Sequence, residues 1–287
     1  MWYRIIRIIR TEYTNSDNVK VCMLPINTSL FTRVRYLSLF VNKTRGLYDY
    51  LNLISPDIIF IHGLQASESL IVCKWCKRHP NVVLYVDQHA DYYNTPIDCA
   101  LVRLRYQIQY GYIAKQLSKY AVKFWGVTPW RVDYLQKVYG VKSEKTDLLV
   151  MGGDEKYVDW ENRMVIRNDI RCKYSIPDDG FLIITGGKID RAKNIHLLME
   201  AVVGLKERKV FLLVFGNLIE EMEIYCTPLI GENVKFVGWL DSKTVYPYFL
   251  AADLAVFPGT HSVLWEQAMS CGIPGIFKDW DGGFSHI

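Results

Sequence analysis

Two lysines stand five residues apart in a setting that suits an anionic ligand. Lys188 follows Gly186 and Gly187, and Lys193 comes just before a stretch with helical periodicity. Glycines let the backbone approach a ligand closely, and the amides at a helix N-terminus are unpaired donors with partial positive charge. This spacing indicates a phosphate-binding turn between a strand and a helix. An ordinary turn with two solvated lysines is the alternative that the same residues allow.

The residues on either side of this turn have the periodicities of a strand and a helix. Phe181–Thr185 is a run of apolar or β-branched residues, which predicts a strand buried on both faces and ended by the two glycines. A helix is predicted over residues 194–206, because apolar residues recur there at i, i+3, i+4 and i+7, namely Ile195, Leu198, Met199 and Val202.

Short apolar strands alternate with helices along most of the chain. Strands are predicted at residues 19–26, 58–62, 82–86, 124–127, 147–151, 181–185, 210–215, 234–237, 254–257 and 276–277. Helices are predicted at residues 28–52, 67–77, 96–120, 130–139, 168–173, 194–206, 220–225, 243–250 and 263–271. This alternation is typical of parallel β-α units, so the predicted fold class is α/β. We expect two tandem Rossmann-like domains, residues 1–160 and 161–287, whose parallel sheets face a cleft, with a charged crossover at 154–167.

Composition and charge exclude several classes of protein. Half of the 287 residues are hydrophobic and 22% are charged, which favours a folded chain with a core. The formal net charge of +4 suits an anionic small molecule or membrane surface and is too small to indicate a nucleic-acid partner. No apolar run approaches the ~18 residues that span a bilayer, and the start lacks the features of a signal peptide. The seven scattered cysteines indicate reduced thiols in a cytosolic protein.

Several other polar residues follow predicted strands. His89, Asp87 and Asp91 lie just after the strand at 82–86, and the two aspartates can equally form Asx turns. His62 and His79 are expected to be structural. Cys73 and Cys76 form a C-x-x-C without a second cysteine pair, and we predict no metal site.

Four segments of the second half carry a family resemblance. They are GGKIDRAKN (186–194), ENVKFVGWL (232–240), FLAADLAVFPG (249–259) and EQAMSCGIPGIF (266–277). Together they resemble the donor-binding domain of glycosyltransferases of the GT-B fold, in particular the retaining family 4. Lys188 takes the place of the arginine and Lys193 that of the lysine in the family's Gly-Arg-Leu-x-x-x-Lys-Gly pattern. The first half resembles the acceptor-side domain more loosely, at residues 56–63, 86–91 and 124–130, and MGGD (151–154) resembles the family's interdomain segment.

The resemblance implies a site for a nucleotide-diphosphate sugar. The residues that it places at the diphosphate are Gly187, Lys188, Lys193 and Ser262. Those that it places at the nucleoside are Gly238, Trp239, Glu266 and Gln267. His89 and His261 are the catalytic candidates at the sugar or acceptor. The family works without a metal ion, so no cofactor is expected besides the nucleotide sugar as co-substrate.

The sequence also departs from the family. Of the family's two glutamates, eight residues apart, the second falls on Gln267, which can hydrogen-bond a ribose but carries no charge. His261 and Ser262 are expected to occupy the space of the first glutamate. The glycine-rich loop of the first strand is absent, and no closing helices follow Ile287, so we expect a chain that lacks the family's first β-α unit and its C-terminal tail.

The expected function is transfer of a sugar from a nucleotide-diphosphate sugar to a glycan or lipid-linked acceptor, without a metal and with retention. Two alternatives remain: a nucleotide-sugar epimerase of the same fold, and a non-catalytic relative that only binds the nucleotide sugar. The basic, aromatic stretch Phe31–Arg45 suits either a peripheral membrane contact or an amphipathic packing helix. The expected location is the cytoplasm, at the inner face of the membrane.

Overall fold

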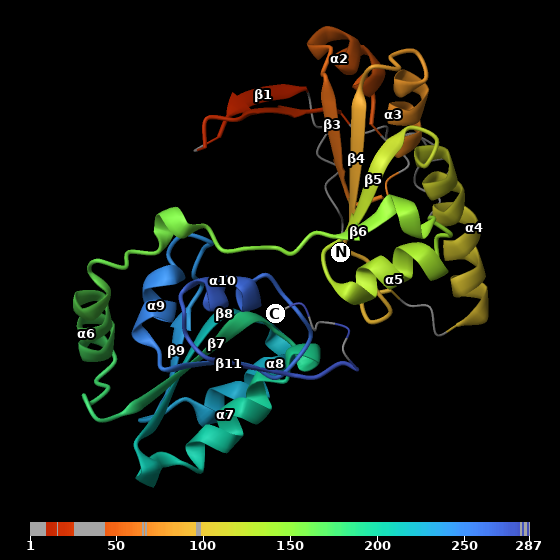
Figure 1. Ribbon diagram of the computed structural model, residues 1–287. Coiled ribbons are helices and arrows are strands. Elements are labelled where there is room, and N and C mark those ends of the chain that lie inside the picture. The colour runs from red at the N-terminus through yellow and green to blue at the C-terminus, as the bar shows by residue number, and fades with distance from the viewer. Residues whose placement is uncertain are drawn as a thin grey trace. The chain divides into compact units, whose positions relative to one another are not determined.

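The computed structural model describes residues 10–25 except 16, 44–95 except 65 and 67, 99–281, and residues 283 and 286 (Figure 1). The chain divides into two compact units, Met1–Leu149 and Val150–Ile287, so the division comes earlier than the expected boundary at residue 160. The segment after Leu149 is anchored in the second unit. The Asp154 backbone N–H donates to the Tyr246 hydroxyl at 2.6 Å, and a Cβ on Gly153 would lie 2.0 Å from Ser270 Oγ.

The first unit contains a parallel sheet of four strands in the order β3-β4-β5-β6. The strands are β3 (Ile58–His62), β4 (Val83–Gln88), β5 (Ala121–Gly126) and β6 (Thr146–Leu148). The helices among the described residues of this unit are α2 (Leu47–Ile54), α3 (Ser69–Cys76), α4 (Ala100–Leu117) and α5 (Pro129–Lys137). Leu84, Val86 and Phe124 of the sheet pack against Trp75 of α3 and Leu117 of α4 to form the core of this unit.

An antiparallel ribbon, β1 (Thr11–Thr14) with β2 (Lys20–Met23), precedes this sheet (Figure 1). The sequence predicts β2 but assigns nothing to residues 1–18, because β1 has no apolar alternation and all four of its residues are exposed. The helical region predicted at 28–52 falls partly outside the described residues, as does most of Phe31–Arg45, and its described end forms α2. Among the described residues, none of the helices is long and apolar enough to span a bilayer.

The second unit contains a parallel sheet of five strands in the order β11-β10-β7-β8-β9. The strands are β7 (Phe181–Ile189), β8 (Val210–Leu218), β9 (Val234–Gly238), β10 (Leu254–Phe257) and β11 (Gly275–Phe277). The helices of this unit are α6 (Arg163–Lys173), α7 (Ile195–Val203), α8 (Glu220–Cys226), α9 (Tyr246–Ala251) and α10 (Leu264–Ser270). Figure 1 shows these helices on both sides of the sheet.

Successive residues of β7 enter two separate hydrophobic clusters. Leu182 and Ile184 pack in the cluster that includes Phe249 of α9, whereas Ile183 packs in the cluster that includes Met199 of α7. Side chains alternate between the faces of a strand, so a strand with both faces covered must be apolar throughout. The predicted double burial is therefore confirmed for Leu182–Thr185, whereas Phe181 at the start of the strand is exposed.

The glycines after this strand do not end it, and that prediction is wrong. β7 continues to Ile189, and Gly186 and Gly187 lie opposite Phe215 and Gly216 of β8 in register. A Cβ on Gly186 would lie 2.6 Å from the Phe215 ring, so the glycine makes room for a large side chain on the neighbouring strand. The turn that carries Lys193 comes after Ile189, as a short 3₁₀ helix (Arg191–Lys193) that leads to α7.

The charged stretch 154–167 is not wholly irregular, because α6 begins inside it at Arg163. Ile166 and Ile170 of α6 pack against the cluster that contains α9. Arg167 donates to Asp253 Oδ1 at 2.6 Å, and Asp253 also accepts from the Leu182 backbone N–H at 2.7 Å. Asp253, which the family resemblance marks, therefore joins α6 to the sheet.

Candidate functional site

A pocket of about 580 Å³ opens in the second unit, beyond the carboxyl ends of β7, β8 and β9. Its described lining residues are Gly187, Lys188, Lys193, Phe215, Gly216, Asn217, Trp239, Leu240, Asp241, Ser242, Ser262, Val263, Leu264 and Gln267. Open α/β sheets bind ligands at this end of their strands. All four residues that the resemblance places at the diphosphate line this one pocket, together with two of the four that it places at the nucleoside.

Main-chain atoms form part of the pocket wall. Gly187 and Gly216 have φ values of +117° and +125°, which L side chains rarely adopt. A Cβ on Gly216 would lie 1.9 Å from the carbonyl oxygen of Gly187. The ends of β7 and β8 can approach this closely because both residues are glycine, and both residues line the pocket.

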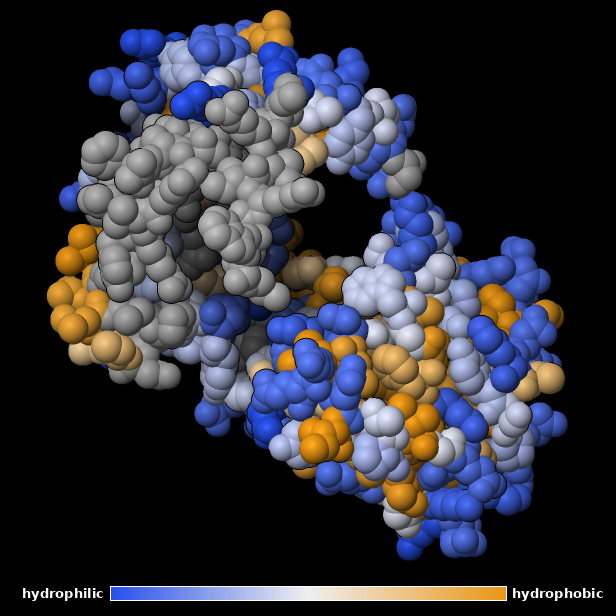
Figure 2. Space-filling model, turned by 180° about the vertical axis from the view of Figure 1, so that it is seen from behind, coloured by the Kyte–Doolittle hydropathy of each residue, from blue (hydrophilic) through white to orange (hydrophobic). Residues whose placement is uncertain are grey.

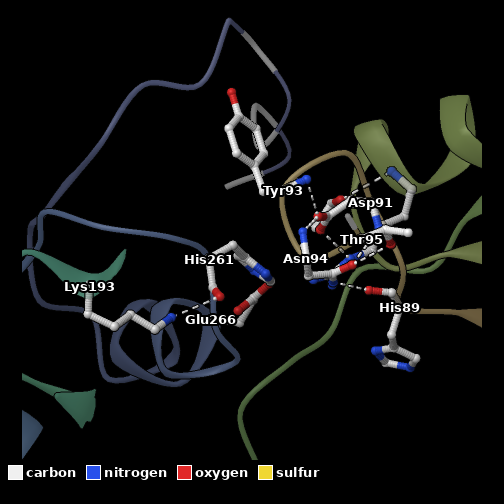
Figure 3. Close-up of polar contacts among 10 residues, drawn as sticks. His89, Asp91, Tyr93, Asn94, Thr95, Lys193, His261 and Glu266 are labelled. Atoms are coloured by element: carbon white, nitrogen blue, oxygen red, sulfur yellow. Dashed lines mark hydrogen bonds and ion pairs between the residues drawn. The ribbon is translucent and has the colours of Figure 1, made fainter. Parts of the chain in front are cut away.

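The two lysines differ in their surroundings. Lys188 is exposed, and its Nζ lies 3.3 Å from Asp190 Oδ2. The Nζ of Lys193 donates to the carbonyl oxygens of Thr260 at 2.5 Å and His261 at 3.1 Å, as Figure 3 shows for His261. Lys193 therefore fixes the loop after β10, whereas Lys188 presents its ammonium group to solvent at the pocket edge.

The loop after β10 is packed tightly on the turn before α7. A Cβ on Gly259 would lie 2.3 Å from Lys193 Cα, and the Thr260 backbone N–H donates to the Ala192 carbonyl oxygen at 3.2 Å. These contacts hold Ser262 at the pocket wall beside Lys193.

Among the residues that the resemblance places at the nucleoside, Gln267 lines the pocket and its Nε2 donates to the Tyr246 hydroxyl at 3.3 Å. Trp239 is exposed at the same wall and presents a large aromatic surface. Gly238, with φ +87°, ends β9 next to it but is not among the described lining residues. Asn217, Asp241 and Ser242 also line the pocket and were missed from the sequence. Asn217 could have been predicted, because it follows the strand expected at 210–215 and a glycine, Gly216. Lys188 likewise follows a predicted strand and glycines.

Glu266 does not lie where the resemblance places it. The described residues that line the pocket do not include Glu266, because the preceding loop and α10 direct its side chain to a buried position beside His261 (Figure 3). Glu266 Oε1 lies 2.7 Å from His261 Nε2 and 3.2 Å from His286 Nε2, and all three side chains are buried. His286 was not predicted, since it stands 20 residues beyond Glu266 and after the last family segment.

The electrostatics of this cluster favour an ionised carboxylate. Burial by itself would raise the pKa of Glu266, but the hydrogen bonds to His261 and His286 outweigh burial and lower the pKa to about 2. An ionised carboxylate only accepts hydrogen bonds, so each Nε2 carries the proton that it shares. We name these residues the Glu266 cluster. It lies directly behind the loop that carries Ser262.

His89, in the first unit, belongs to a similar arrangement at the carboxyl ends of β3 and β4. Asp87 Oδ2 lies 3.1 Å from His89 Nε2 and 2.7 Å from His62 Nδ1, and Asp87 Oδ1 accepts from the Gly63 backbone N–H at 2.8 Å. Burial opposes ionisation of Asp87, yet these hydrogen bonds keep its pKa below the ordinary value. His62, expected to be structural, is exposed at the same place.

Asp87, near the end of strand β4, and Asp91, in the loop after it, have different contacts. Asp91 forms an Asx turn, since its Oδ1 accepts from the backbone N–H groups of Tyr93 at 3.0 Å and Asn94 at 2.9 Å (Figure 3). Asp91 also pairs with Arg131 at 3.1 Å. Asn94 in turn donates to the His89 carbonyl oxygen at 2.6 Å, which orders the backbone at His89.

Two groups among the described residues bring three metal-ligating atoms within 4.8 Å of one another: His62, Asp87 and His89, and the Glu266 cluster. In both groups the carboxylate oxygen already accepts hydrogen bonds from the two imidazoles. The sequence singled out neither as a metal site, because each group joins residues from separate segments.

Residues 166–287 match the family model described as "Glycosyl transferases group 1". The chain is 30% identical over 95 residues to the lipopolysaccharide core biosynthesis glycosyltransferase LpsE of Rhizobium meliloti (strain 1021). That match covers 33% of this chain and 27% of LpsE, about a quarter of its length.

Solved structures share the fold over both units. A glycosyltransferase from Rickettsia africae ESF-5 superposes with a TM-score of 0.65 and 16% identity, covering 90% of this chain and 66% of that one. Anabaena Alr3699/HepE, in complex with UDP and glucose, superposes with a TM-score of 0.57 and 14% identity, covering 88% and 64%. The fold is therefore α/β of the GT-B type.

Proposed function

We propose that residues 166–287, which match the glycosyl transferases group 1 model, bind a nucleotide-diphosphate sugar whose sugar the protein transfers to a glycan or lipid-linked acceptor. The observation that carries the proposal is the pocket of about 580 Å³ in the second unit, where Gly187, Gly216, Lys188 and Ser262 meet at the strand ends. Anabaena HepE, a structural relative, holds UDP and glucose, which supports a nucleotide sugar as the ligand class.

The pocket has the groups that a departing diphosphate needs. Negative charge grows on the leaving group as the bond to the sugar breaks, so fixed donors and cations near it stabilise the transition state more than the ground state. Lys188 supplies a solvent-exposed cation, and Ser262 supplies donors on a loop that Lys193 holds in place. Exposed Trp239 offers a surface on which a base can stack.

The proposed transfer needs no metal ion or other cofactor and proceeds with retention. In this proposal the charge of the diphosphate is balanced by the lysines and by the peptide groups of Gly187 and Gly216. His89 contacts the sugar or the acceptor. His261 acts through the loop that it shares with Ser262, because its imidazole is buried against Glu266. We further propose that the protein acts in the cytoplasm, at the inner face of a membrane that carries its acceptor.

One observation favours a second candidate. Gln267 stands at the nucleoside end without the charge that the family's glutamate has, and it hydrogen-bonds Tyr246 instead. A protein that binds a nucleotide sugar without transferring it is therefore the alternative.

A nucleotide panel tests the proposal. Purified protein is heated with UDP-, GDP- and ADP-sugars, and transfer or hydrolysis is followed as nucleotide release. A ligand at 100 times its Kd stabilises the fold by about 2.7 kcal/mol, which is a measurable rise in Tm. Lys193→Ala should abolish most of this rise, whereas Lys206→Ala, an exposed lysine outside the pocket, should keep it. Stabilisation without turnover supports the binding protein, and no stabilisation by any nucleotide refutes both candidates.

A further inference from the structure

Helix α4 has apolar residues on two opposite sides. Ile113, Ala114 and Leu117 are buried in the core of the first unit. On the other side Leu101 and Ile108 are 77% and 60% exposed, and Leu104 and Tyr112 are exposed as well. A helix that only covers a sheet has a polar outer face, so this second apolar side is not explained by the fold.

The exposed apolar residues form one stripe. Residues 101, 104, 108 and 112 are spaced by three and four positions, which puts them within about 80° on the helix surface. In Figure 2 hydrophobic residues gather at the left edge, over the helix labelled α4 in Figure 1. A contiguous exposed apolar patch on a folded protein often marks a binding surface, whereas apolar residues scattered singly over the surface do not.

A lysine-rich pocket adjoins this stripe along the same helix. Its volume is about 600 Å³, and its described lining residues are Gln107, Gly111, Lys115, Ser118, Lys137, Val138, Tyr139, Gly140, Lys142, Glu144 and Lys145. Lys115 follows Ile108 by seven residues and Tyr112 by three, so its side chain borders the apolar stripe. Of the described lining residues, four are lysines and one, Glu144, is acidic.

One lysine of the pocket is fixed by hydrogen bonds, and two others are exposed to solvent. The Nζ of Lys145 donates to the carbonyl oxygens of Ser118 at 2.6 Å and Ala121 at 2.8 Å, which ties the end of α4 to the pocket. Lys137 and Lys142 are exposed and pair with Asp133 at 2.8 Å and Glu144 at 3.5 Å, contacts that exchange readily with other anions in water.

We propose that the apolar stripe of α4 and the adjoining lysine pocket, together called the α4 face, dock this protein on the surface of an anionic lipid bilayer. An interfacial helix inserts apolar side chains at the acyl boundary while cations beside them meet anionic headgroups. The apolar stripe supplies the inserted side chains, and the lysine pocket supplies the cations.

Charge favours this occupant over a second copy of the chain. A second copy bound through the same stripe would offer the same apolar residues and the same excess of lysines, and not an anionic surface for the four lysines of the pocket. An anionic bilayer instead complements both parts. The inference rests on the proposed function in one respect: docking on a membrane would bring the protein to an acceptor that the membrane holds.

Vesicle sedimentation tests the proposal. The full chain is mixed with phosphatidylcholine vesicles that contain or lack phosphatidylglycerol, and bound protein is measured in the pellet. We expect binding to the anionic vesicles that weakens with added salt. Leu104→Glu with Ile108→Glu should lower the partition coefficient at least about tenfold. The control Ile224→Glu, a residue 76% exposed on α8 in the other unit, should bind like the unmodified protein.

The lysines are tested separately. Lys115→Gln with Lys142→Gln should lower binding to anionic vesicles about tenfold or more, because each cation near such a surface contributes about 1 kcal/mol, and should leave the far weaker binding to neutral vesicles unchanged. Equal binding to both kinds of vesicle, or undiminished binding by either double variant, overturns the proposal. So does a dimer that the Leu104 and Ile108 changes dissociate. Nucleotide-dependent Tm shifts measured on the same variants show whether the donor pocket is intact, so the two proposals fail independently.

Discussion

The Nε2 atom of His261 lies 2.7 Å from the Oε1 atom of Glu266, and both side chains are buried directly behind the pocket wall. A buried carboxylate is stable only when it is paired and hydrogen-bonded, and His286 completes this pairing at 3.2 Å. The Glu266 cluster thus fixes three segments to one another: the loop after β10, helix α10, and the chain at residue 286.

Stability should depend on pH through Glu266. Its pKa in the folded protein is about 2 against an ordinary 4.5, so the carboxylate stabilises the fold above about pH 4.5 and this contribution is lost as pH falls toward 2. The difference corresponds to on the order of 3 kcal/mol. Glu266→Gln should lower the free energy of unfolding in urea at pH 7 by about this amount and flatten the acid dependence. The exposed Glu200→Gln serves as control, and equal curves for both variants would contradict the assignment.

Gly216 should tolerate no side chain. Alanine there meets the Gly187 carbonyl oxygen at 1.9 Å and must adopt a φ of +125°. Gly216→Ala should therefore cost about 2 kcal/mol or more in unfolding free energy and weaken nucleotide binding. Gly231→Ala is the matched control, because nothing lies within 4 Å of its added Cβ. A Gly216→Ala variant as stable as Gly231→Ala would show that the two strand ends are not in close contact.

Substitutions of Lys188 and Lys193 should differ in their effects on ligand affinity and on thermal stability. Lys188 is exposed and paired only with Asp190 among the contacts described, so Lys188→Ala should weaken nucleotide-sugar affinity about fivefold without changing Tm. Lys193→Ala should lower both, because Lys193 also holds the carbonyl groups of Thr260 and His261. Isothermal titration at two salt concentrations with parallel melting curves distinguishes the two effects. An unchanged Tm for Lys193→Ala would count against its structural role.

Asp87 should set the tautomer of His89. As an ionised acceptor it keeps the proton on His89 Nε2, which leaves Nδ1 as an acceptor when the ring is neutral. In Asp87→Asn an amide N–H₂ at the Oδ2 position would demand the other tautomer. We expect kcat to fall about 100-fold with little change in donor KM, and the imidazole nitrogen shifts of His89 to change in NMR spectra. Asp57→Asn, an exposed aspartate in the same unit, should leave both unchanged. Unaltered His89 shifts in Asp87→Asn would refute the role.

The strands and helices could be predicted where local patterns decide them. The apolar run is buried on both faces from Leu182 to Thr185 as expected, and the Leu254–Phe257 strand has the predicted bounds. Gly186 and Gly187 were misread because a glycine pair usually ends a strand, and here its meaning depends on Phe215 and Gly216 of a neighbouring strand. Register between strands distant in sequence is not visible in a local pattern.

The candidate site was predictable in part, because some of its residues belong to a local sequence pattern and others are brought together only by contacts between distant segments. Lys188, Lys193, Ser262 and Gln267 meet in one pocket as the family pattern implied. Glu266 was misplaced because one residue on a helix changes the facing direction by about 100°, and His286 was missed because its partner lies far along the chain. The sequence could not decide between an Asx turn and another role for Asp87, since its contact with His62 follows from the pairing of β3 with β4.

The glycine-lined wall of the pocket has one more consequence. Peptide groups at Gly187 and Gly216 are the same whatever side chains surround them, so this part of the wall offers no choice between ligands. Discrimination among the proposed nucleotide-sugar ligands must then come from the side chains around it, such as Trp239, Asn217 and Asp241. Exchanging those three side chains would alter which ligand is preferred while the glycine-lined wall stays unchanged.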